Sequence, residues 1–249
     1  MDITIAILVF VVGIFVGFIN TLAGSGSLLS LPMLIFAGLP PVVANGTNRI
    51  SILLQTLVGL LTFRKEKMLD VRNAFLLSLA AVPGAIAGSL IAVDIPDEVM
   101  KTFIGAMIVF FIIITIINPK RFRKDHKEKY DVKLKWFHYL IFVFIGAYGG
   151  FIQAGVGVFM LFALTLTAGY DLVRANAIKL ALTFVFTPFA LATFIYHDQV
   201  EWIPGLVLAG GSMIGAWIAA KLAIKKGSAA IRYVLLIALA ASAVKLFFF

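Results

Sequence analysis

Cysteine is absent from the sequence, and charged residues occupy only 13% of its 249 positions. Without cysteine there can be no disulfides, thiolate metal ligands or cysteine nucleophiles. A soluble domain carries about a quarter charged residues, so this chain has too few charges to form a water-facing surface. We also find no phosphate-binding Walker loop, no His-Glu-x-x-His motif and no paired carboxylates. The sequence therefore predicts neither an enzyme nor an ATP-driven pump, and we expect no metal or other cofactor.

Apolar residues make up 62% of the chain, and the mean hydropathy is +1.07. Several apolar runs reach the roughly 20 residues that a helix needs to cross the hydrocarbon core of a bilayer. These runs are apolar on all sides, whereas the strands of a membrane β-barrel would alternate. The solvent for most of this surface is therefore the lipid bilayer, and we predict an all-α polytopic membrane protein.

Polar breaks divide the chain into apolar segments of two lengths. Eight are long enough to be transmembrane helices, and they lie at about 3–23, 43–63, 71–93, 99–117, 135–154, 176–196, 202–222 and 229–248. Two shorter segments, 27–37 and 158–168, suit half-helices that either cross as part of a broken helix or re-enter. The first segment follows Met1-Asp2 without a basic region or a cleavage site, so we interpret it as a membrane helix rather than a signal peptide.

The chain consists of two similar halves. A single shift of 131 positions aligns the halves without a gap between residues 24 and 101, and internal repeats of this kind are common in secondary transporters. We predict a first membrane repeat at 1–117, a basic linker at 118–134 and a second membrane repeat at 135–249. The aligned pairs include Gly24 with Gly155, Gly26 with Gly157, Asn45 with Asn176, Thr56 with Thr187, Asp70 with Glu201 and Gly84 with Gly215.

Loop charges predict that the halves insert with opposite topology. The basic loop 64–72 is the repeat mate of the acidic loop 195–203, and the acidic loop 94–101 is the mate of a basic one. The positive-inside rule then places loops 64–72, 118–135 and 221–228 in the cytoplasm of a cell membrane and both termini outside. This rule also accounts for the net charge of +9, so we expect no nucleic-acid partner. Whether the chain forms homo-oligomers is left open by the sequence.

Two cations inside the apolar segments, Arg49 and Lys179, are candidates for a substrate site. No Asp or Glu lies inside these segments, so a cavity around the two cations would favour a small anionic substrate. The alternative is that each side chain lies near a helix start and snorkels to the interface. Helical spacing puts Asn45 and Asn48 on one face with Arg49, and Asn176 on one face with Lys179.

Paired glycine breaks separate each short segment from the long one before it. The first is Gly24-Ser25-Gly26 and the second is Gly155-Val156-Gly157. A helix that restarts after such a break exposes unpaired N–H groups that can bind an anion. The alternative is that these glycines allow two helices to pack closely. Asn20 precedes the first break and Gln153 the second, and both are candidate neutral donors to a substrate.

The sequence resembles the sulfite exporter family known as TauE/SafE, over essentially the whole chain. The motifs that carry the resemblance are Ala37-Gly38-Leu39-Pro40-Pro41, Ala44-Asn45-Gly46-Thr47-Asn48, the run from Gly149 to Gly157, and the run from Asp171 to Lys179. The chain departs from the family pattern in having Ser25 and Ser27 beside the first glycines, and Thr47-Asn48-Arg49 in the third helix.

This resemblance implies export of sulfur-containing anions such as sulfite, sulfoacetate or related organosulfonates. Combined with the cations and the repeat, it leads to the hypothesis of an alternating-access permease with one anion site between the repeats, near the bilayer midplane. An anion channel, in which Arg49 and Lys179 form a selectivity ring, and a transporter of another small organic anion are the alternatives. From these features Arg49→Ala is expected to abolish transport while leaving folding near normal.

Overall fold

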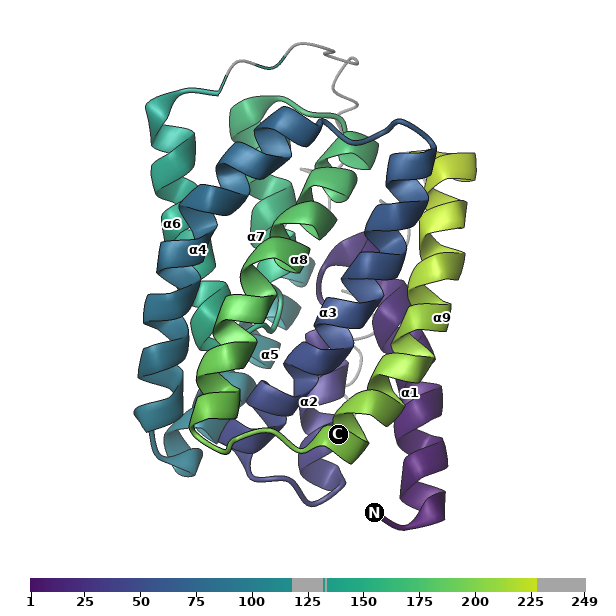
Figure 1. Cartoon of the computed structure of the whole chain (residues 1–249), viewed down its shortest axis with the longest axis vertical. Helices are drawn as coiled ribbons and strands as arrows, with labels where there is room; N and C mark the ends of the chain where they lie inside the picture. Colours follow the sequence, from purple (N-terminus) through teal and green to yellow (C-terminus); the bar gives the residue numbers. More distant parts are fainter. Residues whose placement is uncertain (118–131, 133, 228–249) are drawn as a thin grey trace.

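The computed structural model describes residues 1–117, 132 and 134–227, and the elements in this part of the chain are all helical. Figure 1 shows them as one bundle of long, roughly parallel or antiparallel helices, with shorter helices between them. In chain order the elements are α1 (Ile3–Ala23), α2 (Ser27–Phe36), α3 (Pro41–Lys65), α4 (Val71–Asp94), α5 (Asp97–Ile117), α6 (Trp136–Phe151), α7 (Val156–Phe162), the π-helix η2 (Ala163–Ala168), α8 (Leu172–Tyr196) and α9 (Trp202–Lys226).

Seven of the eight predicted long segments are helices in the structure, and the eighth, 229–248, lies outside the described residues. The predicted linker 118–134 lies almost entirely outside them too. The two short segments are α2 and the continuous pair of α7 and η2. By length and composition, four helices of the described part can cross a membrane: α1, α4, α8 and α9. The chain is thus a helical, multi-pass membrane protein.

Both short helices turn back toward the end of the bundle from which they came (Figure 1). α1 starts at the lower end, beside the N-terminus, and α2 returns to that end, where α3 begins. α6 starts at the upper end, and α7 with η2 returns there, where α8 begins. Each short helix therefore doubles back after its glycine break, and each break lies inside the bundle.

Glycines bring two helix pairs into backbone contact, and each pair joins the first half of the chain to the second. α1 packs against α9, and α4 packs against α6. A methyl group on Gly88 of α4 would clash with the carbonyl oxygen of Ala147, and one on Gly215 of α9 would clash with that of Ile14. Such close approach is how helices associate where lipid replaces water. The halves consequently interlock instead of forming two separate bodies.

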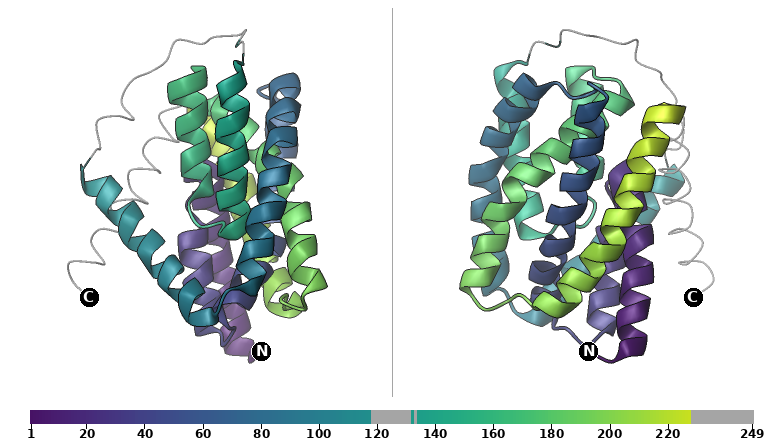
Figure 2. Two further views of the ribbon diagram at one scale, coloured as in Figure 1. Left: turned by 90° about the vertical axis from the view of Figure 1, so that its left-hand side faces the viewer. Right: turned by 45° about the vertical axis from the view of Figure 1, so that its right-hand side comes forward.

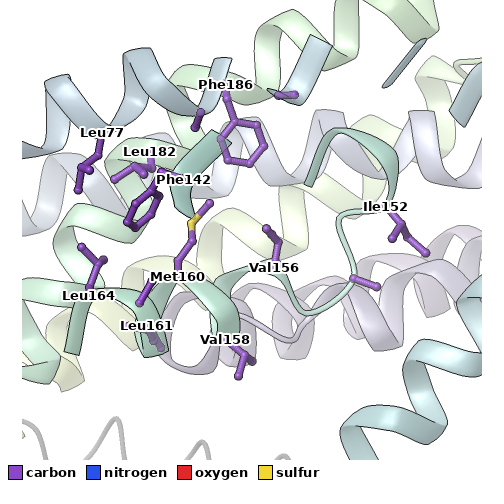
Figure 3. Close-up of a cluster of buried hydrophobic side chains, with 14 of the residues drawn as sticks. Leu77, Phe142, Ile152, Val156, Val158, Met160, Leu161, Leu164, Leu182 and Phe186 are labelled. Carbon is purple, nitrogen blue, oxygen red and sulfur yellow. The ribbon is translucent and has the colours of Figure 1, made fainter. Parts of the chain in front are cut away.

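Apolar side chains from four helices surround the second glycine break (Figure 3). Ile152 and Val156 flank the break and are buried among side chains from α4, α6, α7 and α8, including Leu77, Phe142 and Phe186. Helix α5, which leans away from the bundle toward its C-terminal end (Figure 2), packs Phe111 against Phe159 of α7, with ring centroids 5.5 Å apart. Dispersion contacts of this kind stabilise the break, since lipid offers little hydrophobic driving force.

The loops at the two ends of the bundle differ in their balance of charge, although Glu66, Asp70 and Asp171 also lie at the basic end and Lys101 at the acidic one (Figure 1). The upper end carries the α3–α4 loop, the start of α6 and the end of α9, with Arg64, Lys65, Lys67, Arg72, Lys135, Lys225 and Lys226. The lower end carries the N-terminus and the α4–α5 and α8–α9 loops, with Asp2, Asp94, Asp97, Glu98, Asp198 and Glu201. Within the described residues, the basic loop 64–72, Lys135 and the end of α9, which the sequence assigned to one side of the membrane, therefore share one end of the molecule.

Candidate functional site

The two glycine breaks meet in the interior of the bundle. Gly24 and Gly155 have φ angles of 76° and 74°, a left-handed conformation that other residues rarely adopt. A methyl group on Gly157 would collide with the Cα atom of Gly24, and one on Gly24 would collide with that of Gly157. The glycines thus turn the chain and also let the breaks of the two halves touch, as the close-packing alternative predicted.

A small cavity of about 10 Å³ lies at this junction. Its volume is about that needed by one water molecule. Five residues predicted for the site line it, namely Asn20, Gly24, Gln153, Gly157 and Lys179. The other lining residues, Ile52, Thr56, Val156, Leu180 and Thr183, were not predicted. Ser25, Gly26 and Gly155 belong to the same breaks but do not line the cavity.

Lys179 of α8 binds the end of α1. Its side chain is 2% exposed, so it does not snorkel to the interface. The Nζ atom donates to the carbonyl oxygens of Asn20, at 3.0 Å, and Thr21, at 2.8 Å. These carbonyls belong to the last turn of α1, where the helix dipole favours a positive charge. A cation from the second half of the chain therefore caps the broken helix of the first half.

Arg49 of α3 makes the reciprocal contact with the end of α6. Its side chain is fully buried, and its guanidinium donates to the carbonyl oxygens of Gly149, at 3.0 Å, and Gly150, at 2.5 Å. The guanidinium carbon also lies 4.6 Å from the ring centroid of Phe194, within cation–π range. A cation from the first half thus caps the broken helix of the second half.

Gln153 connects Arg49 with the cavity. Its Oε1 atom accepts a hydrogen bond from Arg49 Nη1 at 3.4 Å, and its Nε2 atom donates to the hydroxyl of Thr187 at 3.2 Å. Thr187 was not predicted as a site residue, although its match with Thr56 in the repeat was a usable signal, since Thr56 lines the cavity. Gln153 therefore links Arg49 to the cavity, as Asn20 does for Lys179.

The three predicted asparagines of α3 and α8 have different surroundings. Asn45 donates to the carbonyl oxygen of Phe151, at the end of α6, at 2.7 Å. Asn176 is fully buried, and neither amide atom has a hydrogen-bond partner in the described part of the chain. Asn48 instead binds the serine hydroxyls of α2, Ser27 and Ser30. The expected polar stripe on α3 is consequently divided, because only Asn45 and Arg49 turn toward the break of α6.

Comparison with known proteins gives a consistent picture across the chain. The profile of the family described as "Sulfite exporter TauE/SafE" matches residues 9–246. A "Probable membrane transporter protein" of Haemophilus influenzae is 30% identical over 234 residues, covering 93% of this chain and 91% of that protein. The "Probable membrane transporter protein ORF9" of a Sinorhizobium species is 26% identical, covering 95% of this chain and 90% of that protein.

Similar agreement comes from the "Probable membrane transporter protein YfcA" of Escherichia coli K12, which is 25% identical over 240 residues, or 96% of this chain and 88% of that protein. No solved structure matches the chain. The match to the family covers nearly every residue, including both breaks and both cations. On this evidence the chain belongs to the sulfite exporter TauE/SafE family and is a membrane transporter.

Proposed function

We propose that this transporter is a permease for small sulfur-containing anions, such as sulfite, sulfoacetate or related organosulfonates, and that it works by alternating access. The observation that carries the proposal is the reciprocal capping at the junction of the breaks. Arg49 and Lys179 come from different halves, and each holds the broken helix of the other. A site built in this way between two halves can change whenever the halves move relative to one another.

An anionic substrate is supported by the charges that the interior holds. Among the described residues, the buried side chains with a fixed charge are Arg49 and Lys179, and no Asp or Glu is buried. Both cations are bound by neutral carbonyl oxygens rather than by carboxylates. Positive charge without a matching negative charge, far from water, favours an anion that enters. The family name and the absence of a buried acid point in the same direction.

Inverted-topology repeats are the second part of the proposal. Under the 131-residue shift, α1 corresponds to α6, α3 to α8, and α4 to α9. The α1–α9 pair then has α4–α6 as its counterpart, the α3–α9 pair has α4–α8, and α3–α8 is its own counterpart. In Figure 1, α3 rises from the lower end whereas α8 descends from the upper end. These relations support a pseudo-two-fold axis that passes through the junction of the breaks.

Alternating access is supported by how tightly the junction is closed. A cavity of about 10 Å³ has no room for an oxyanion of four or more heavy atoms. An anion could enter only if the backbones at Gly24 and Gly157 moved apart. The structure would then represent a closed state of the junction, and binding would be coupled to separation of the breaks.

Transport itself is the first test. Purified protein in proteoliposomes should take up radiolabelled sulfite and sulfoacetate in a saturable manner. An imposed potential should drive the flux, because each negative charge gains about 2.3 kcal/mol per 100 mV. Exchange between internal and external anion would support a carrier, whereas a flux that rises linearly with concentration would favour the channel alternative. Vesicles of folded protein that carry neither anion would rule out this substrate class.

Orientation can be tested directly, because the chain has no native cysteine to interfere. We propose that the basic end faces the cytoplasm, as the positive-inside rule requires. Lys65→Cys lies at the basic end and Glu98→Cys at the acidic end, and both positions are exposed. In intact cells a membrane-impermeant maleimide should label Glu98→Cys but reach Lys65→Cys only after lysis. The reverse pattern of labelling would show that the protein inserts the other way.

A further inference from the structure

Lys179 and Arg49 occupy nearly corresponding positions in the two halves, but they differ in their relation to the cavity. Lys179 lines the cavity directly, whereas Arg49 is not among the lining residues. The guanidinium of Arg49 is held by two carbonyl oxygens and lies against the ring of Phe194. Its route to the cavity is the hydrogen bond to Gln153. The two cations therefore cannot have the same role toward a ligand at this junction.

Lys179 retains a donor for a ligand. A lysine ammonium has three N–H donors, and two of them are used by the carbonyl oxygens of Asn20 and Thr21. The third can bind a group in the cavity that Lys179 lines. Two neighbouring polar groups, the amide of Asn176 and the hydroxyl of Thr21, are also buried without a partner among the described residues. Because buried polar groups are rarely left unpaired, this cluster has the composition expected of a ligand site.

The orientation of the Gln153 amide follows from the chemistry of Arg49. A guanidinium is a donor only, so the amide atom that faces it must be the oxygen. The amide nitrogen of Gln153 must then be turned away from Arg49, where it donates to Thr187. That nitrogen has a second N–H, and Gln153 lines the cavity. If Arg49 did not fix the amide, rotation by half a turn could present the oxygen, which would repel an anion.

We infer that Lys179 and Gln153 contact the transported anion, and that Arg49 is a positioning residue that directs the Gln153 amide nitrogen to the cavity. This inference rests on the proposed function, because it divides the work within the same site. The unpaired Nε atom of Arg49 does not change the assignment, since Arg49 does not line the cavity. The site selects anions through two kinds of donor, one charged and one neutral.

Binding of sulfite to purified protein, measured by calorimetry in detergent, tests the two contacts. Lys179→Gln should weaken binding about 100-fold, because a buried charge partner is lost. Gln153→Leu should weaken it about 10-fold, through loss of one hydrogen bond to a charged group. Gln153→Glu should abolish binding while the thermal midpoint stays at or above that of the unchanged protein, since the new carboxylate can pair with Arg49. Lys225→Gln, on the exposed end of α9, is the matched control and should bind normally.

A double-mutant cycle tests the positioning role of Arg49. Arg49→Lys keeps a buried cation but replaces the two nitrogens of the guanidinium fork by one, so the two carbonyls and the amide lose their present hydrogen-bond geometry. It should weaken sulfite binding about 10-fold in the original protein and should have no further effect in the Gln153→Leu protein. Losses that add in the double variant would mean that Arg49 touches the anion itself, and unchanged binding in Arg49→Lys would show that no positioning is needed.

Three results would therefore overturn the inference: normal binding in Lys179→Gln, additive losses in the cycle, or no effect of Arg49→Lys. Each requires that the unchanged protein binds sulfite. If folded, unchanged protein binds neither sulfite nor sulfoacetate, the proposed function fails instead. Titration of the unchanged protein with sulfite and sulfoacetate therefore shows whether the proposed function or only this inference has failed.

Discussion

Replacing Arg49 by alanine is expected to unfold the protein rather than to inactivate a folded one. The change removes the donors for the carbonyl oxygens of Gly149 and Gly150 and for the side-chain oxygen of Gln153. Each buried acceptor left unpaired costs about 1–3 kcal/mol, and the missing guanidinium adds a cavity beside Phe194. The sum approaches the whole stability of about 5–15 kcal/mol that is typical of a protein.

The matched control for this prediction is Arg64→Ala, at the exposed end of the same helix, which should change the thermal midpoint little. Both variants would be compared in detergent, by monodispersity on size exclusion and by thermal unfolding. A normal midpoint for Arg49→Ala, together with lost transport, would contradict the expectation. It would also restore the simpler interpretation from the sequence, in which Arg49 serves the substrate alone.

The sequence suggested that Arg49 serves only the substrate, because the hydrogen-bond partners that Arg49 has in the structure cannot be recognised in a sequence. The sequence showed a cation in an apolar helix with no acid nearby, which left an anionic ligand as the natural partner. Arg49 instead finds backbone carbonyls about 100 positions away, where α6 ends before its glycine break. Backbone groups are present at every residue, so no pattern of side chains marks these ones in advance.

The helices and breaks were predictable because few physical alternatives exist for them. A run of about 20 apolar residues has to form a helix in lipid, since every backbone group must be paired. Gly24 and Gly155 are the residues that take up the left-handed turns, as their glycine identity suggested. The return of each short helix to the end of the bundle where the preceding helix starts was harder to predict. A segment of some 10 residues can be either half of a crossing helix or a helix that turns back.

The threonines that line the cavity, in contrast, could not be predicted from the sequence. Thr56 and Thr183 donate to carbonyl oxygens of their own helices. Thr62, Thr165 and Thr167 do the same elsewhere, far from the breaks. A threonine in a membrane helix therefore has a local explanation for its hydroxyl, and its spacing gives no sign of a site. The repeat pairs Thr56 with Thr187 but also Thr62 with Thr193, so it narrows the candidates without singling out the cavity.

Asn48 illustrates how far the repeat can be extrapolated. A strict shift of 131 positions pairs Asn48 with Lys179, yet Arg49 is the residue that repeats the capping contact. One residue corresponds to about 100° around a helix, so Asn48 faces α2 and binds Ser27 and Ser30. The repeat therefore predicts which helices correspond, whereas the face that each residue occupies depends on local packing.

The junction of the breaks is where a single methyl group should have the largest effect on transport. Gly157→Ala would place a Cβ atom against the Cα atom and the carbonyl oxygen of Gly24, and neither backbone atom can rotate away. Overpacking of this kind costs about 1–3 kcal/mol. If the transport cycle must pass through this closed state, destabilising it by that amount slows turnover about 5- to 150-fold. We therefore expect Gly157→Ala to reach the membrane but to carry sulfite at a small fraction of the normal rate.

Gly105→Ala is the matched control, because a Cβ atom on this glycine of α5 meets nothing within 4 Å. It should transport normally and gain up to about 1 kcal/mol of stability, since alanine favours a helix over glycine. Rates would be measured in proteoliposomes with equal amounts of folded protein. A normal rate for Gly157→Ala would mean that the two breaks never need to close on one another during transport. The closed junction would then lie outside the cycle, and the case for alternating access at this site would be lost.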